Sequence, residues 1–331
     1  MPDGESRRQT RTIRDARGLA AAGLIPPGAE AAAARVAGRY AISVTDHVAR
    51  LMNPADPADP IALQYIPDSA ELLTAPGETD DPTADGPFTP VKGVVHRYPD
   101  RALLKPLLAC PVYCRFCFRR EVVGPDGGLL TEAELEAALA WFERTPAVRE
   151  AVLTGGDPFM LSARRLGAML RRLAAVPHIE TLRVHTRVPV ADPARVDAAL
   201  VQALRVEKPV YVALHANHAR EFAAEATAAL SRLADAGVPL LGQSVLLRGV
   251  NDSAEALEAL FRAMLRARVK PYYLHALDPA PGVSRFAVPD AEGLRLLEGL
   301  RGKVPGHGLP VFVRESPAGG GKRPVARASG A

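Results

Sequence analysis

Short apolar runs alternate with longer stretches of helical periodicity from about residue 103 onward. The runs with the length and apolar content of strands are residues 103–108, 151–154, 181–186, 210–215, 239–245 and 271–275. Apolar residues at helical spacing predict helices between them, at residues 132–144, 193–204, 219–236 and 253–268. Thr131 and Glu134 have the spacing of a capping box before the first helix. Successive strand-then-helix units predict a parallel sheet, closed or nearly closed into a barrel.

The chain on either side of these units has a different pattern. Alanine-rich, helix-like stretches flank Pro26 and Pro27, and residues 76–90 have the Pro, Gly, Asp and Thr content of an irregular surface segment. A last strand-like run at residues 309–313 precedes a glycine-rich tail. We therefore predict an N-terminal helical and irregular region over residues 1–90, a (β/α) barrel core over 91–290 and a C-terminal segment over 291–331.

Residues with reactive or polar side chains, and a pair of glycines, lie at the ends of the predicted strands or just after them. In chain order they are Cys110, Cys114 and Cys117, then Gly155, Gly156 and Asp157, then His185, His215, Gln243, His275 and Asp278. Active sites of parallel barrels gather at the carboxyl ends of the strands, so this order predicts a site there. A doubly wound sheet is the weaker alternative, because no G-x-G-x-x-G follows any of these strands.

Charge and hydropathy narrow the possible partners. The net charge of +4 is modest, and no clustered Lys/Arg stripe with interleaved aromatics indicates a nucleic-acid partner. No apolar run reaches the length of a membrane span. The polar N-terminus mixes Asp3, Glu5 and Asp15 with arginines and lacks the apolar segment of a signal peptide. We expect a cytoplasmic protein that binds neither nucleic acid nor membrane.

The three cysteines of the chain all lie in one short segment, as Cys110-x-x-x-Cys114-x-x-Cys117. An odd number at this spacing argues against a disulfide framework. Structural zinc normally takes four protein ligands, so zinc would need a histidine to complete the site, an alternative that stays open. Three thiolates on a four-iron cluster would leave one iron free to bind a small molecule.

This cysteine spacing resembles the signature of the radical S-adenosylmethionine superfamily. The resemblance implies a [4Fe-4S] cluster on Cys110, Cys114 and Cys117, whose open iron chelates S-adenosylmethionine. Gly155 and Gly156 would let the backbone approach that ligand closely, and Asp157 or a nearby carbonyl would accept from its ammonium. The fold implied is a partial (β/α)6 barrel of radical SAM type, with the N-terminal helical region beside it and a short C-terminal segment closing the site.

Longer motifs narrow the resemblance to the lysine 2,3-aminomutase family. They are HRYPDR at 96–101, CRFCFRR at 114–120, VLTGGD at 152–157, QSVLLRGVND at 243–252 and PYYLHALD at 271–278. Members hold pyridoxal 5'-phosphate on a lysine after a glycine run, the place that Lys322 occupies here. Arg97, Tyr98 and Arg101 resemble the residues that bind this cofactor, since guanidinium groups suit phosphate.

The same resemblance assigns the remaining site residues. Arg119 matches the arginine that binds the substrate carboxylate. His215 and Gln243 match positions near S-adenosylmethionine. Asp278 and Glu315 match two acidic positions that receive the distant ammonium of lysine. The implied reaction begins with a 5'-deoxyadenosyl radical that takes a hydrogen from lysine bound to pyridoxal phosphate, and it ends in β-lysine.

Three departures distinguish the chain from the longer, fermentative members: its short C-terminal segment, its lack of further cysteines and His275 in place of a tyrosine. They resemble the shorter branch that makes (R)-β-lysine for elongation factor P. This implies an electron donor such as flavodoxin or ferredoxin and an indirect link to that factor. Alternatives are an aminomutase for ornithine, arginine or glutamate, or a non-catalytic iron–sulfur or zinc protein.

Overall fold

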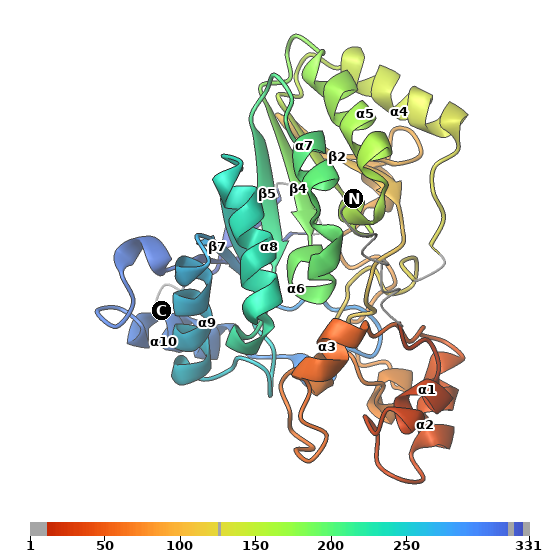
Figure 1. Cartoon of the computed structure of the whole chain (residues 1–331), viewed down its shortest axis with the longest axis vertical. Coiled ribbons are helices and arrows are strands. Elements are labelled where there is room, and N and C mark those ends of the chain that lie inside the picture. The colour runs from red at the N-terminus through yellow and green to blue at the C-terminus, as the bar shows by residue number, and fades with distance from the viewer. Residues whose placement is uncertain (1–11, 125–126, 317–320, 327–331) are drawn as a thin grey trace, which may run out of the picture.

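A nine-stranded sheet is the central element of the computed structural model, which describes residues 12–124, 127–316 and 321–326 (Figure 1). The strands follow each other across the sheet in chain order. They are β1 (Val94–Tyr98), β2 (Arg101–Leu107), β3 (Glu150–Gly155), β4 (Thr181–Thr186), β5 (Val210–His215), β6 (Leu240–Val245), β7 (Lys270–His275), β8 (Val311–Glu315) and β9 (Lys322–Pro324). Strands β2 to β8 are parallel, and β1 and β9 are antiparallel to their neighbours.

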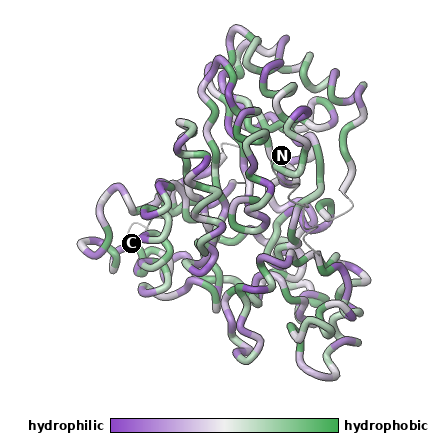
Figure 2. Tube along the Cα trace, viewed as in Figure 1, coloured by the Kyte–Doolittle hydropathy of each residue, from purple (hydrophilic) through white to green (hydrophobic). Residues whose placement is uncertain are grey.

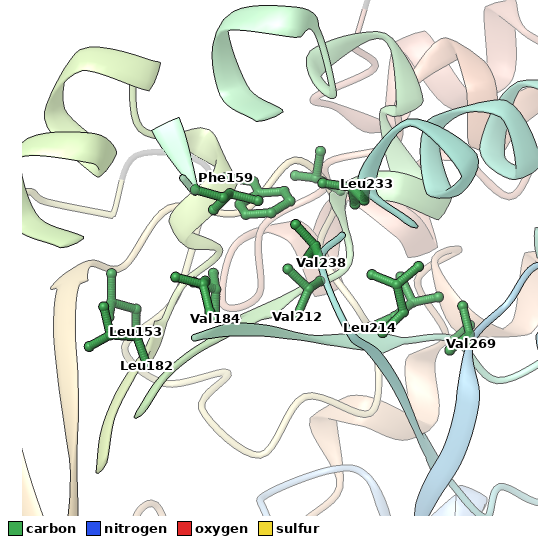
Figure 3. Close-up of a cluster of buried hydrophobic side chains, with 14 of the residues drawn as sticks. Leu153, Phe159, Leu182, Val184, Val212, Leu214, Leu233, Val238 and Val269 are labelled. Carbon is green, nitrogen blue, oxygen red and sulfur yellow. The ribbon is translucent and has the colours of Figure 1, made fainter. Parts of the chain in front are cut away.

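Helices that connect the parallel strands cover one face of the sheet (Figure 1). These connecting helices are α4 (Glu132–Glu143), α5 (Ala163–Ala174), α6 (Val188–Ala191), α7 (Ala198–Ala203), α8 (Ala224–Asp235), α9 (Ala254–Arg266) and α10 (Asp290–Gly299). Three further helices precede the sheet in the N-terminal region: α1 (Ala16–Ala21), α2 (Glu30–Ala37) and α3 (Asp46–Leu51). Buried Leu182, Val212 and Leu214 of the sheet belong to one core cluster with Phe159 and with Leu233 of α8 (Figure 3). Burying such side chains contributes about 1.5–3 kcal/mol each.

The predicted partial barrel is confirmed, and most predicted strands lie within two residues of the observed ones. The capping box of Thr131 and Glu134 is present at the start of α4. Two predicted helices are wrong in extent. Residues 193–204 and 219–236 each contain a separate 3-10 turn before the α-helix: Asp197 caps the first α-helix by accepting from Leu200 N, and His218 and Glu221 form a capping box around the second 3-10 turn.

The pattern does not predict α5, α10, β1 or β9. Strands β1 and β9 are short and lie at the edges of the sheet: β1 begins with two buried valines and continues with His96 and Arg97, and β9 is polar. The sheet curls so that these two edges approach each other. Arg97 and Tyr98 of β1 contact Glu315 of β8 and Lys322 of β9, respectively. The barrel is therefore joined across its open side by polar contacts instead of a strand ladder.

The N-terminal region has its own apolar cluster, which includes Leu19, Ile42, Val44 and Tyr65. Figure 2 shows hydrophobic residues in the N-terminal helices as well as along the barrel strands. Within the described ranges, no helix has the length and apolar character needed to cross a bilayer. The region meets the barrel through apolar side chains and through buried polar side chains, and the polar ones bear directly on the site.

Candidate active site

The three cysteines lie on the loop that follows β2, and none of them is in a disulfide. The loop is held from inside by Arg115, whose guanidinium is fully buried and donates to the carboxylate of Glu71 at 2.6 Å. Arg120 donates to the same carboxylate, and Arg115 N donates to the carbonyl of Gln64 at 2.8 Å. The N-terminal region thus supplies the counter-charge and the acceptor that fix the cysteine loop.

Burial and neighbouring negative charge both disfavour ionised cysteines. Burial raises the pKa of each thiol; the charges of Asp157, Cys117 and Cys114 raise that of Cys110 further, and the charge of Cys114 raises that of Cys117 further, to about 11. Three adjacent thiolates are thus unfavourable in the protein alone, whereas iron ions would compensate their charge. In the described part of the chain, no three His, Cys, Asp or Glu side chains are arranged around a single ion. A four-iron cluster instead takes each thiolate on a different iron, so the residues fit that group.

Gly155 and Gly156 face the base of the cysteine loop. A Cβ at Gly156 would lie 2.3 Å from the carbonyl oxygen of Ala109, and Gly155 has a φ of +105°. Glycine is required here because the loop backbone occupies the space that side chains would need. Asp157 is buried and accepts from Thr186 Oγ1 at 2.7 Å and from Arg187 N at 2.7 Å. Its carboxylate thus accepts hydrogen bonds from the protein itself, and its expected contact with the ammonium of S-adenosylmethionine stays a prediction.

A cluster of charges lies where the two sheet edges meet. Asp85, from the irregular segment before β1, accepts from Arg97 at 2.8 Å, from Arg119 at 3.1 Å and from Lys105 at 3.3 Å. Burial tends to raise the pKa of Asp85, but Arg119, Lys105 and Arg97 outweigh it and hold the pKa at about 2. Asp85 therefore faces three cations, of which, in the part of the chain that the structure describes, only Arg97 also pairs with a second carboxylate, that of Glu315, and this leaves positive charge at Arg119 and Lys105 available for an anionic ligand.

Lys322 and two acids complete this cluster. Lys322 Nζ lies 2.9 Å from Glu315, and Arg97 donates to the other oxygen of that carboxylate at 2.8 Å. Burial and the charge of Glu315 raise the pKa of Asp278 to about 6. Two acids and a lysine thus share one region beside the arginines.

Tyr98 joins the ends of the sheet. Lys322 N donates to its hydroxyl at 2.6 Å, and the Arg101 guanidinium lies 4.5 Å from its ring centroid. A Cβ at Gly321, whose φ is +71°, would lie 2.0 Å from the Tyr98 ring. The last glycine of the run is therefore required for close packing against Tyr98. Gly319 and Gly320 lie outside the described residues.

His215 and Gln243 are paired in register at the ends of β5 and β6. His215 Nε2 lies 3.2 Å from Asn217 Oδ1, and Gln243 Nε2 lies 3.4 Å from His185 Nδ1. Burial lowers the pKa of His215 well below its usual range, and it lowers that of His275 to about 3 with help from Lys322. These imidazoles are therefore neutral and suit hydrogen bonding more than proton transfer at neutral pH.

The structure brings Arg97, Tyr98, Arg119, Glu315 and Lys322 into one connected group, and it places Arg101 at its rim. Sequence reasoning missed residues that support the cysteine loop and this group. They are Gln64 and Glu71 beside the loop, and Asp85 and Lys105 within the charge cluster. The first three come from the region predicted as helical and irregular, and no local pattern distinguishes a buried acid from a solvated one.

The chain resembles known proteins in sequence and in fold. The Radical SAM superfamily model matches residues 104–261. The L-lysine 2,3-aminomutase of Acetoanaerobium sticklandii is 39% identical over 284 residues, which are 86% of this chain and 69% of that protein. The glutamate 2,3-aminomutase of Clostridioides difficile is 34% identical over 87% of this chain and 67% of that protein. The structure of Streptococcus suis SuiB bound to precursor peptide SuiA aligns with a TM-score of 0.50 and 14% identity over 67% of this chain and 50% of that one, which concerns the fold alone.

Proposed function

The chain belongs to the lysine 2,3-aminomutase family of radical S-adenosylmethionine enzymes and is an isomerase, and we propose that it converts L-α-lysine to β-lysine. Cys110, Cys114 and Cys117 hold a four-iron cluster in this proposal, and pyridoxal phosphate binds at Lys322. The cluster with S-adenosylmethionine supplies a carbon radical that can remove an unactivated hydrogen, and pyridoxal phosphate supplies the π-system for amino-group migration.

The observation that carries the proposal is a primary ammonium paired with Glu315, whose charge also acts on a second acid, Asp278. Lys322 Nζ lies 2.9 Å from Glu315, and the charge of Lys322 also acts on Asp278. The two acids are therefore placed to accept an alkylammonium. Lys322 would hold pyridoxal phosphate, and Glu315 and Asp278 would accept the ammonium of the substrate.

The opposite end of the substrate would lie at Arg119. This guanidinium is largely buried, and its partner Asp85 is shared with Arg97 and Lys105. A carboxylate can therefore bind to Arg119 in a bidentate manner without leaving a buried cation unpaired. Anchors of opposite charge at the two ends fix which hydrogen of the chain faces the radical.

The cofactors would use the remaining predicted residues. Arg97 and Arg101 suit the phosphate group of pyridoxal phosphate, and Tyr98 lies between Arg101 and the backbone of Gly321. The backbone of Gly155, Gly156 and Asp157, with His215 and Gln243, would contact S-adenosylmethionine, since these residues end the strands that follow the cysteine loop.

The negative charges of Glu315 and Asp278 also allow the alternative substrates to be ranked. The side-chain carboxylate of glutamate would be repelled by Glu315 and by Asp278 in its ionised form, so we do not favour glutamate although a relative is named for it. Ornithine and arginine carry a positive side chain and differ from lysine in length. They remain the alternatives within the same chemistry.

We further propose that the product is (R)-β-lysine for modification of elongation factor P in the cytoplasm, with a flavodoxin or ferredoxin as electron donor. Residues 1–90 would act as a supporting region, 91–290 as the catalytic barrel and 291–331 as the segment that brings Lys322 to the site. The contacts of Gln64, Glu71 and Asp85 with the barrel support the first assignment.

The test is the product formed from isotopically labelled L-lysine by the anaerobically reconstituted protein with dithionite, S-adenosylmethionine and pyridoxal phosphate. We expect labelled β-lysine, with ornithine, arginine and glutamate converted more slowly. The Cys114→Ala protein is the control and should form no product. A wild-type protein that binds the cluster and cleaves S-adenosylmethionine but isomerises glutamate faster than lysine would overturn the substrate assignment.

A further inference from the structure

Arg187 contacts one of the three cysteines directly. It follows β4 and is 5% exposed, and its Nη1 donates to Cys114 Sγ at 3.1 Å. Among the described residues, neither Cys110 nor Cys117 receives such a bond from a side chain. The three sulfurs are thus electrostatically unequal before any cluster is considered.

The guanidinium is locked in place from several sides. Arg187 Nη2 donates to Gln64 Oε1 at 2.6 Å and to Glu221 Oε2 at 2.8 Å, and its Cζ lies 4.9 Å from the Tyr65 ring centroid. Gln64 Oε1 also accepts from Asn217 Nδ2 at 3.1 Å. A buried cation with this many fixed partners cannot turn away from the sulfur without breaking other hydrogen bonds.

The charge of Arg187 is balanced by one acid. Glu221 is 1% exposed, and its other oxygen accepts from Asn217 N at 2.7 Å and His218 N at 2.9 Å. Both members of this ion pair are held by groups outside it. Removing either charge would therefore change the field at Cys114 in a defined direction.

Resting on the cluster assignment of the proposed function, we infer that Arg187 is a positioning residue that sets the reduction potential of the cluster through Cys114. Hydrogen bonds to ligating sulfurs and nearby charge are the main protein controls on that potential. A cationic donor stabilises the more negative, reduced cluster and so raises its potential. Glu221 opposes the effect and Gln64 fixes its geometry.

The experiment measures the midpoint potential of the reconstituted cluster by redox titration followed by EPR, without S-adenosylmethionine. Iron content and thermal unfolding of the cluster-free protein are measured in parallel. We expect Arg187→Gln to shift the potential to more negative values, Arg187→Lys to shift it less, and Glu221→Gln to shift it to more positive values. Arg183→Gln is the control, because Arg183 is buried on β4 and paired with Glu150 at 2.9 Å but contacts no cysteine; it should shift the potential far less.

The outcomes separate the inference from the function on which it rests. A wild-type protein that holds no cluster contradicts the proposed function. A wild-type cluster whose potential is unchanged in Arg187→Gln and Glu221→Gln contradicts the role of Arg187 alone. Weaker S-adenosylmethionine binding in Arg187→Gln at an unchanged potential would also overturn it, since Arg187 would then be a ligand-binding residue. If the Arg187 variants lose iron, the potential of Glu221→Gln decides the question: a positive shift supports the role of Arg187, and an unchanged potential contradicts it.

Discussion

The barrel core and its contact with the N-terminal region differ in the side chains that they bury. The core is a continuous cluster of aliphatic and aromatic side chains between the sheet and helices α4 to α9. The contact also includes apolar side chains, but it contains a set of polar pairs, which we call the seam, between the N-terminal region and barrel arginines: Asp59 with Arg220, Gln64 with Arg187, Glu71 with Arg115 and Arg120, and Asp85 with Arg97 and Arg119. Buried ion pairs add little net stability compared with apolar packing, but they have one geometry. The core therefore stabilises the barrel, and the seam positions the groups of the site.

Among the substitutions that test this comparison, we expect Glu71→Gln to lower the free energy of unfolding most. This change leaves the buried guanidinium groups of Arg115 and Arg120 without their carboxylate, at a cost of about 3–5 kcal/mol. Leu182→Ala in the core should cost a similar amount, about 2–5 kcal/mol, through a cavity. Denaturant unfolding of both cluster-free proteins measures these costs.

Iron content after reconstitution then separates the two regions. We expect Glu71→Gln to lose most of its iron, because the cysteine loop loses its anchor, and Leu182→Ala to keep it under conditions where both proteins are folded. Equal iron content in the two variants would contradict the division of roles between seam and core.

A smaller effect is expected from the acids near Lys322. Hydrogen bonds to charged groups contribute about 1.5–3 kcal/mol, so Asp278→Asn and Glu315→Gln should each lower kcat/KM for lysine about tenfold or more. Asp278→Asn should not lower the free energy of unfolding, because it removes an acid that the charge of Glu315 disfavours. Kinetics with lysine, together with iron and pyridoxal phosphate content, measure this. Wild-type kinetics in both variants would remove the acids from the substrate site.

The smallest effect concerns pH. The pKa of Asp278 is raised to about 6, so its charge is lost as the pH falls through that value and regained above it. Because the ionised form would bind the ammonium of lysine, kcat/KM should be about twofold lower at pH 6 than at pH 8. The acidic limb of the pH profile should disappear in Asp278→Asn. If the acidic limb is unchanged in that variant, a group other than Asp278 causes it.

The sequence predicts the elements of the core better than it predicts the polar contacts of the seam. Periodicity predicts β4 and β5 to the residue, because their apolar pattern reflects burial in the core. The cysteine spacing and the motifs around Arg97, Arg119 and Lys322 indicate the site through family resemblance. The seam is not predicted, because Glu71 and Asp85 lie in polar segments whose burial depends on distant arginines. The same holds for Arg187, whose contact with Cys114 joins residues 73 positions apart.

The meeting of the two sheet edges at a pyridoxal phosphate site is the central claim, and borohydride reduction tests it most directly. After reduction of the reconstituted protein and digestion, we expect the pyridoxyl mass on the peptide that contains Lys322, at the edge strand that contacts Tyr98. The Lys322→Ala protein should show no label while it keeps its cluster. Label on Lys105, which lies beside Asp85 in the same charge cluster, or on the exposed Lys92 would contradict the claim.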